Sequence, residues 1–325
     1  MRVLIIGGTR FIGRHIAQAA LDRQHDVTLF NRGRTAPNLF AEAEHVQGDR
    51  RQGGLQALAS RTFDLVVDTS AYFPADVRAL EILAPTTGQY TFMSSLSVYR
   101  EPVAAGTDES GPVWELAGPV PEEIADAETY GALKAECEDE ADSVFPERAF
   151  KVRAGFVAGP HDYSDRVVDW LRRIFEREIV LAGRPDQPLQ LIDARDLADW
   201  VITAAEGSVT GTFNTTGPER PLTMRTFLQT CQSVTASTVE LAWADDDFLL
   251  SHGIEPAEEL PFWLPRTLED FCRFDCSKAV RHGLAFRPIE ETISDTWVWA
   301  QERTDEARRR LAPSREATLI EELGR

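Results

Sequence analysis

The chain has 325 residues, with 53 acidic and 34 basic side chains, so its formal net charge at pH 7 is −19. This negative charge repels other polyanions, and we therefore expect no nucleic-acid partner. The sequence has no uncharged apolar run of about 18 residues, and it begins without a charged leader segment or a cleavage site. We expect a cytoplasmic protein with no membrane partner.

The four cysteines are scattered, with no CxxC pair and no histidines at zinc spacing nearby. We therefore predict no metal site and no disulfide framework, and we interpret the cysteines as reduced and mostly buried thiols. The length of the chain allows one or two domains.

Residues 2–6 form a short apolar and β-branched run, which predicts a central parallel strand. The sequence GGTRFIG follows, and residues 11–23 then show the apolar spacing of a helix. Strand, glycine turn and helix in this order indicate a nucleotide-binding turn, in which amides at the start of the helix hold a pyrophosphate. Gly7 would permit the tight turn, and Gly13 the close approach of helix to strand. The predicted cofactor-binding residues of this turn are Gly7, Thr9, Arg10, Phe11, Ile12 and Gly13.

The end of the second predicted strand, residues 26–30, bears on the choice of cofactor. An NAD-specific site would place an acidic residue there to bind the ribose 2′-hydroxyl group, but this chain has Asn31 followed by Arg32 and Arg34. In addition, Arg10 replaces the middle glycine of the usual turn, where a guanidinium would lie over the phosphates or pair with a 2′-phosphate. We therefore favour NADP(H) over NAD(H), although surface arginines are common in a chain so rich in them.

Two further buried strands are predicted at residues 63–71 and 89–95, and a helix at 75–84. Alternating strands and helices predict the α/β fold class, with a Rossmann-type doubly wound parallel sheet that binds its ligand at the carboxyl ends of the strands. Asp49 follows a short third strand and would either lie near the adenine or be solvated. Ser70, near the end of residues 63–71, is a further predicted cofactor ligand at this edge.

The fifth strand delivers three serines to the same edge of the sheet: Ser94, Ser95 and Ser97. Because side chains alternate along a strand, neighbouring serines would point to opposite faces. A loop of about thirty residues follows, and connections of this length are usually functional. The next predicted helix carries Tyr130 and Lys134 one turn apart on the same face, and Lys134 is one of only three lysines in the chain.

The chain resembles the extended and atypical short-chain dehydrogenase/reductase superfamily, in its group of NAD-dependent epimerases and dehydratases. The segments that carry the resemblance are GGTRFIG, FMSSLSVY, YGALK, VRAGFVAGPHD and QLIDARDLADWV, in this order. The similarity extends from residue 1 to about residue 300. It implies that the parallel sheet is accompanied by a smaller C-terminal substrate lobe.

The resemblance also implies three catalytic residues: Ser95, Tyr130 and Lys134. Tyr130 would be the acid/base that exchanges a proton with a substrate hydroxyl or carbonyl oxygen. A phenol with a pKa near 10 is a poor base at neutral pH, so Lys134 would supply a charge beside it and also bind the nicotinamide ribose. Ser95 would hydrogen-bond the reacting oxygen, with Ser94 and Ser97 as alternatives.

The domain boundaries follow from the same resemblance. Residues 1–160 would form the NAD(P)-binding Rossmann domain, with contributions from about 189–216, and residues 161–305 mainly the substrate lobe. His161 and Arg166 are candidate substrate contacts. Residues 306–325 form a charged tail, which either folds back as a helix or stays mobile. A homodimer is usual in the superfamily, and we treat one as an option.

Three functions remain open at this point. The first is an NAD(P)-dependent oxidoreductase that transfers a hydride between nicotinamide and a small-molecule carbonyl or alcohol substrate. The second is a nucleotide-sugar epimerase or dehydratase, which would need side chains for a second pyrophosphate; the candidates are Arg166, Arg172, Arg173 and Arg184. The third is a non-catalytic NADP-binding redox sensor or RNA-binding protein, because Arg10 in place of glycine resembles the atypical branch.

Overall fold

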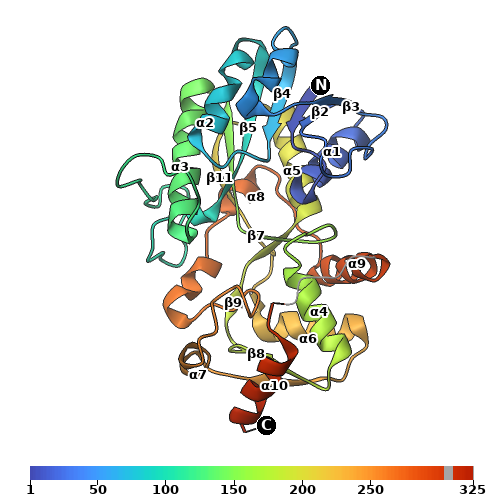
Figure 1. Ribbon diagram of the computed structural model, residues 1–325, viewed down its shortest axis with the longest axis vertical. Helices are drawn as coiled ribbons and strands as arrows, with labels where there is room; N and C mark the ends of the chain where they lie inside the picture. Colours follow the sequence, from blue (N-terminus) through green and yellow to red (C-terminus); the bar gives the residue numbers. More distant parts are fainter. Residues whose placement is uncertain (304–309, 325) are drawn as a thin grey trace.

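The computed structural model describes residues 1–303 and 310–324, which form two lobes stacked along the long axis of the molecule (Figure 1). The N-terminus lies in the first lobe and the C-terminus at the far end of the second. We call the first the nucleotide lobe and the second the substrate lobe.

The nucleotide lobe contains a seven-stranded sheet in the order β11-β6-β5-β4-β1-β2-β3, and every pair of neighbouring strands is parallel. This order is the doubly wound arrangement extended by one strand, and it confirms the predicted fold class. The strands are β1 (Arg2–Ile6), β2 (Asp26–Asn31), β3 (Glu44–Gln47), β4 (Phe63–Asp68), β5 (Thr87–Ser95), β6 (Ala149–Ala154) and β11 (Gly211–Thr215).

Helices cover both faces of this sheet. Helix α1 (Phe11–Asp22) packs against α5 (Ala194–Glu206) on one face, while α2 (Pro74–Arg78) and α3 (Ala127–Val144) cover the other (Figure 1). The helix predicted at residues 75–84 is shorter than expected. Its α-helical part ends at Arg78 and is followed by two 3-10 turns, Ala79–Ile82 and Ala84–Thr86.

The substrate lobe has its own apolar core, in which Trp170, Phe227 and Trp263 are fully buried. Three two-stranded sheets form part of it: β7 (Phe156–Ala158) with β10 (Leu191–Asp193), β8 (Ile179–Ala182) with β13 (Glu240–Trp243), and β9 (Pro188–Leu189) with β12 (Leu222–Thr223). Its helices are α4 (Arg166–Glu176), α6 (Met224–Thr235), α7 (Asp246–Ser251), α9 (Ile289–Glu302) and α10 (Pro313–Glu322).

The chain crosses between the lobes more than once. After β10 it returns to the nucleotide lobe as α5 and β11, and it returns again as α8 (Ser277–Arg281), which packs on β11. The two lobes are therefore interleaved in sequence, and no single cut separates them.

The C-terminal helix α10 folds back on the substrate lobe. Glu316 is buried there and accepts hydrogen bonds from Arg173 at 2.6 Å and from the main-chain N–H of Leu181 at 2.9 Å. Residues 306–309 and 325 of the predicted tail lie outside the described residues. No helix in residues 1–303 and 310–324 is both long and apolar enough to cross a membrane.

Candidate cofactor and active site

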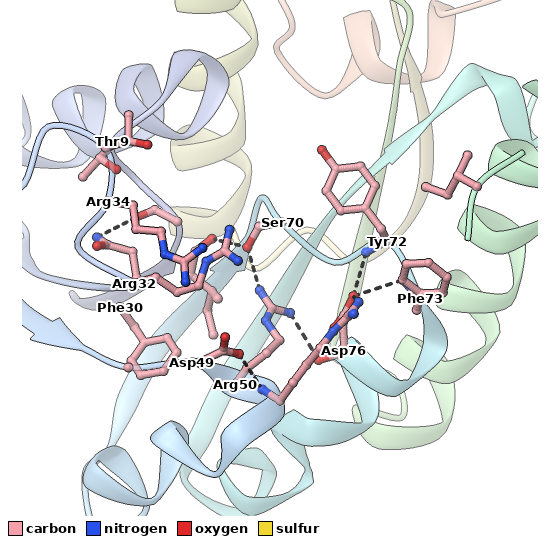
Figure 2. A pocket seen from close by; sticks show the side chains of 17 residues that line it. Thr9, Phe30, Arg32, Arg34, Asp49, Arg50, Ser70, Tyr72, Phe73 and Asp76 are labelled. Atoms are coloured by element: carbon pink, nitrogen blue, oxygen red, sulfur yellow. Dashed lines mark hydrogen bonds and ion pairs between the residues drawn. The ribbon is translucent and has the colours of Figure 1, made fainter. Parts of the chain in front are cut away.

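A cavity of about 570 Å³ opens at the carboxyl edge of the sheet, beside the ends of β1, β2 and β4 (Figure 2). A parallel α/β sheet binds its ligand at this edge. The residues of the cavity wall that the sequence predicted as cofactor ligands are Gly7, Thr9, Asn31, Arg32, Arg34, Asp49 and Ser70.

The glycine turn between β1 and α1 leaves no room for side chains. Gly7 has a φ of 109°, and a Cβ atom on it would overlap the hydroxyl group of Thr69. A Cβ atom on Gly13 would lie 2.9 Å from the main-chain nitrogen of Gly8, so helix and turn approach closely. Phe11 and Ile12 begin α1, where the first amides lack an acceptor within the helix and favour an anion.

Asn31, at the end of β2, uses its side chain to hold the adjoining loops. Its Nδ2 atom donates to the carbonyl of Gly7 at 3.2 Å, and its Oδ1 atom accepts from the N–H of Gly33 at 2.8 Å. Arg32 and Arg34 are exposed and extend along the cavity wall (Figure 2). The position where a carboxylate would bind ribose is therefore surrounded by positive charge.

Arg50 is a residue of the site that the sequence did not single out. Its guanidinium makes a two-point contact with the fully buried carboxylate of Asp68, at 2.6 and 2.8 Å, and donates to Ser70 at 2.7 Å. Asp68 closes the apolar run of β4, and Arg50 follows Asp49 at the same sheet edge. These positions in the sequence could have indicated that both residues lie near the site. No short sequence pattern predicts that they form an ion pair.

A second arginine pair fixes the loop that follows. Arg51 contacts both oxygens of Asp76, at 2.6 and 2.8 Å, and Asp76 also accepts from the N–H groups of Tyr72 and Phe73 at 3.1 Å (Figure 2). Asp49 lines the cavity and accepts from the N–H of Arg51 at 3.0 Å, so it caps a short turn at the cavity wall.

Helix α3 begins where Asp126 accepts a hydrogen bond from the N–H of Thr129 at 2.7 Å. It carries Tyr130 and Lys134 against the end of β5. The glycine between them, Gly131, permits this contact, because a Cβ atom there would overlap the carbonyl oxygen of Ser97. Close packing of the helix against this turn therefore sets the position of Tyr130.

The environment of Tyr130 keeps its phenol protonated. Burial raises its pKa, as do Tyr72 and Tyr163, whereas a hydrogen bond with Ser95 lowers it. The rings of Tyr72 and Tyr130 lie 6.4 Å apart, centroid to centroid. At neutral pH the group is therefore a proton donor, and Lys134 is not among the main influences on its pKa.

Lys134 is almost completely buried and lies behind the cavity wall. Its Nζ atom donates to the carbonyl of Ala71 at 3.0 Å and to that of Met93 at 2.7 Å. Ala71 stands between Ser70 and Tyr72, both of which line the cavity. Burial lowers the pKa of Lys134 to about 8, so the ammonium form still prevails at neutral pH. An ammonium has three N–H donors, and two are engaged by these carbonyls.

The three serines separate as strand geometry requires. Ser95 lies beside Tyr130, and its hydroxyl donates to that of Ser97 at 3.1 Å. Ser94 points to the other side and donates to the buried Glu138 at 2.6 Å, which pairs with Arg153. Among these serines, Ser95 lies next to the phenol and Ser94 belongs to a structural network.

Two of the predicted site residues, Arg10 and His161, make ring contacts that the sequence did not predict. Arg10 is outside the cavity wall, and its guanidinium stacks on the ring of Tyr163 at 3.5 Å. His161 packs between His15 and Trp299, with ring centroids at 5.8 and 5.2 Å, and burial lowers its pKa to about 4. The ring thus packs between a residue of α1 and a residue of α9, and a contact with substrate stays a prediction.

Arg166, the other candidate substrate contact, begins α4. Its guanidinium lies over the ring of Phe156 at 5.5 Å and donates to Ser164 at 3.3 Å. Phe156 follows the end of β6, whose Ala154 pairs with Ser95 in the sheet. Arg166 thus packs where the chain passes from β7 to α4, and a contact with substrate stays a prediction.

The sequence profile of the NAD dependent epimerase/dehydratase family matches residues 3–215. The chain belongs to this family. The expected resemblance is thereby confirmed, as is the expectation of an enzyme family, and the match covers the cavity, the serines, Tyr130 and Lys134.

Two curated relatives match shorter segments. Over 113 residues the chain is 32% identical to the chloroplast stem-loop binding protein of 41 kDa b of Arabidopsis thaliana. This aligned segment covers 30% of each chain. Over 106 residues it is 27% identical to phenylcoumaran benzylic ether reductase PT1 of Pinus taeda, covering 33% of this chain and 32% of the relative. The chain thus matches about a third of the length of these relatives.

Solved structures of similar shape cover nearly the whole chain. A putative epimerase from Burkholderia cenocepacia has a TM-score of 0.69 at 18% identity, with 92% of this chain and 98% of the other covered. UDP-glucose 4-epimerase from Thermus thermophilus, in complex with NAD, has a TM-score of 0.66 at 17% identity, with 94% and 100% covered. These similarities confirm the Rossmann-like α/β fold.

Proposed function

We propose that the protein is an NADP(H)-dependent oxidoreductase that transfers a hydride between nicotinamide C4 and the carbonyl or alcohol carbon of a small molecule. The observation that carries this proposal is that Tyr130 and Lys134 both lie next to residues of the cavity wall, although neither lines the cavity itself. Lys134 binds the carbonyl of Ala71 behind that wall, and the Tyr130 ring lies 6.4 Å from Tyr72, which is part of it.

The residues present fit a dinucleotide. The side-chain-free turn at Gly7 and Gly13 leaves space for a pyrophosphate against the first amides of α1. Arg32 and Arg34 supply positive charge for a 2′-phosphate, and this supports NADP(H) over NAD(H). Lys134 has a third N–H beyond the two that bind carbonyls, and this donor would bind the nicotinamide ribose in the proposed complex.

The proposed reaction needs one hydride and one proton. A bound reduced nicotinamide supplies the hydride to the carbonyl carbon. Tyr130 donates its phenolic proton to the carbonyl oxygen, which Ser95 holds by a hydrogen bond, and the product is an alcohol. The phenolate that remains recovers a proton from water before the next turnover. In the reverse direction, Tyr130 is the base.

Two of the four arginines considered for a second pyrophosphate are already engaged. Arg173 is 3% exposed and pairs with Glu316, and Arg184 pairs with Asp246 and Glu269 at 3.0 and 2.8 Å. This supports a reductase that releases its product. The pine relative is also named as a reductase.

A nucleotide-sugar epimerase is the second candidate. It is supported by membership of the epimerase/dehydratase family and by Arg166, which lies toward the substrate lobe. A non-catalytic nucleic-acid-binding role is suggested by the name of the Arabidopsis relative, but the net charge of −19 disfavours it.

The proposal is tested by calorimetric titration of the protein with NADP(H) and NAD(H), followed by turnover assays with the tighter-binding reduced form. A panel of carbonyl compounds and nucleotide sugars would be screened in parallel. We expect tighter binding of NADP(H) and oxidation of the cofactor with a carbonyl compound. Conversion of a nucleotide sugar without net oxidation would favour the epimerase, and retention of an RNA stem-loop without any turnover would favour the binding role.

A further inference from the structure

Arg10, Tyr163 and Tyr72 connect three separate segments above the cofactor cavity. Arg10 ends the β1–α1 turn, Tyr72 lies in the loop after β4, and Tyr163 belongs to the segment between β7 and α4 that opens the substrate lobe. We call this set the Arg10 bridge. We propose that Arg10 is a ligand of the cofactor pyrophosphate, that Tyr163 positions it, and that it does not bind the 2′-phosphate; this inference rests on the proposed cofactor site.

The location of Arg10 separates it from the adenosine end of the cavity. Thr9 lines the cavity but Arg10 does not, whereas Arg32 and Arg34 do. Arg10 is also the N-cap residue of α1, with an extended backbone and no capping hydrogen bond from its side chain. Its guanidinium therefore lies near the N-terminus of α1, where a pyrophosphate would bind. A 2′-phosphate would instead bind near Arg32 and Arg34.

Tyr72 shows that the bridge crosses the route from the adenosine end to Tyr130. Thr9 and Tyr72 stand on opposite sides of the cavity in Figure 2. Tyr163 is the middle residue of the Arg10 bridge. Its hydroxyl interacts with that of Tyr72, and the guanidinium of Arg10 stacks on its ring. A dinucleotide that reaches from the cavity to Tyr130 must pass this line, and its pyrophosphate is the part that does so.

The stacking geometry leaves Arg10 able to bind an anion. A guanidinium that lies over an aromatic ring uses its face, while its five N–H donors point outward in the plane. Tyr163 is held in turn by an edge-to-face contact with Phe11, at 6.2 Å between ring centroids. An arginine that is already oriented loses less side-chain freedom on binding a phosphate, so the stack should increase affinity.

The test compares affinities for three ligands: NADP⁺, NAD⁺ and ADP-ribose, which has the pyrophosphate but neither the 2′-phosphate nor the nicotinamide. Calorimetry would be performed on the full chain and on Arg10→Gln, with Arg34→Gln as the matched control. Loss of a charge-assisted contact should weaken binding of all three ligands by about tenfold in Arg10→Gln. Arg34→Gln should weaken NADP⁺ alone.

The role of Tyr163 needs its own variants. Tyr163→Ala removes the ring and should weaken all three ligands about threefold to tenfold, whereas Tyr163→Phe keeps the ring and should bind nearly as the wild type does. In the double variant Arg10→Gln/Tyr163→Ala, the losses should not add, because Tyr163 acts through Arg10. Thermal unfolding of each variant would confirm that this exposed arginine and half-exposed tyrosine are not needed for folding.

Each alternative outcome overturns a distinct statement. If Arg10→Gln weakens only NADP⁺, Arg10 is a 2′-phosphate ligand. If it weakens none of the three ligands, the bridge is a surface contact without a role in binding. If its losses add fully to those of Tyr163→Ala, Tyr163 does not position it. If the wild-type protein binds none of the three, the proposed function fails together with this inference.

Discussion

Each lobe of the molecule buries a basic side chain almost completely: Lys134 in the nucleotide lobe, 4% exposed, and Arg173 in the substrate lobe, 3% exposed. Arg173 lies beside two carboxylates, Glu316 at 2.6 Å and Asp169 at 3.7 Å. Lys134 instead donates both of its described hydrogen bonds to main-chain carbonyl groups, which carry only partial charge.

The difference separates a structural cation from a functional one. Burial lowers the pKa of Arg173, to about 10, but Asp169 acts to raise it, and the ion pair with Glu316 on α10 helps to hold the end of the chain. Among the described residues no carboxylate forms an ion pair with Lys134, and burial lowers its pKa to about 8 although Asp68 and Glu138 act to raise it. A group of this kind gains most from a negative partner that arrives or forms during function, such as the phenolate of Tyr130.

Replacing Arg173 with alanine should give the largest loss of stability. The change leaves Asp169 and Glu316 buried without their shared cation, and breaking a buried pair costs about 3–5 kcal/mol. Urea unfolding would measure the loss, and cofactor affinity of the folded variant should equal that of the wild type. Arg172→Ala, a half-buried neighbour on the same helix, is the control and should lose less than about 1 kcal/mol. Equal losses in the two variants would contradict the comparison.

Lys134 should make stability depend on pH in a defined window. Its pKa is about 8 in the folded protein and 10.5 without burial, so between these values the unfolded chain binds more protons. Stability attributable to Lys134 should therefore rise with pH from about 8 to 10.5, by up to about 3 kcal/mol. The measurement is the unfolding free energy of the wild type minus that of Lys134→Met across this range. If this difference in unfolding free energy does not change with pH, burial does not destabilise the charged form of Lys134, and the prediction is wrong.

Gly131→Ala should disturb the placement of Tyr130 and Lys134. The added methyl group would overlap the carbonyl oxygen of Ser97, and overpacking of this kind costs about 1–3 kcal/mol. Turnover should fall more than cofactor affinity, because α3 shifts relative to the cavity. Gly118→Ala is the matched control, since a Cβ atom there meets nothing within 4 Å. Similar turnover in both variants would mean that the close packing is not what positions the phenol.

Arg34→Gln should have the smallest effect on stability and a selective effect on binding. Arg34 is exposed at the cavity wall, so unfolding should change by less than about 0.5 kcal/mol. The affinity for NADP(H) should fall about tenfold, because one charge-assisted contact to the 2′-phosphate is lost, while NAD(H) affinity stays the same. Calorimetry would measure the affinity for both cofactors. If the affinity for NAD(H) falls as much as that for NADP(H), Arg34 binds a part of the dinucleotide that the two cofactors share.

The nucleotide lobe could be predicted in some detail because its signals are local. A central parallel strand is buried on both faces, so β1 and β4 appear as continuous apolar runs. The turn at Gly7 requires a positive φ and an empty Cβ position, and only glycine meets both conditions. The serines, Tyr130 and Lys134 could be placed at one edge because parallel strands end there.

Side-chain partnerships could not be predicted, because they join residues that are distant in the chain. Arg50, in the turn after β3, meets Asp68 at the end of β4, and Glu316 reaches Arg173 from the last helix. A sequence shows that an arginine is present but not whether a carboxylate already binds it. For the same reason the ring contacts of His161 with His15 and Trp299 could not be predicted from the sequence.

The account depends most on Tyr130 as the group that moves the proton. Turnover and cofactor affinity of Tyr130→Phe, measured on the same preparation, test it directly. The account predicts that turnover falls by about 10²- to 10⁴-fold while the dissociation constant for NADP(H) changes by less than about threefold. Turnover at the wild-type rate, with cofactor still bound, would contradict it.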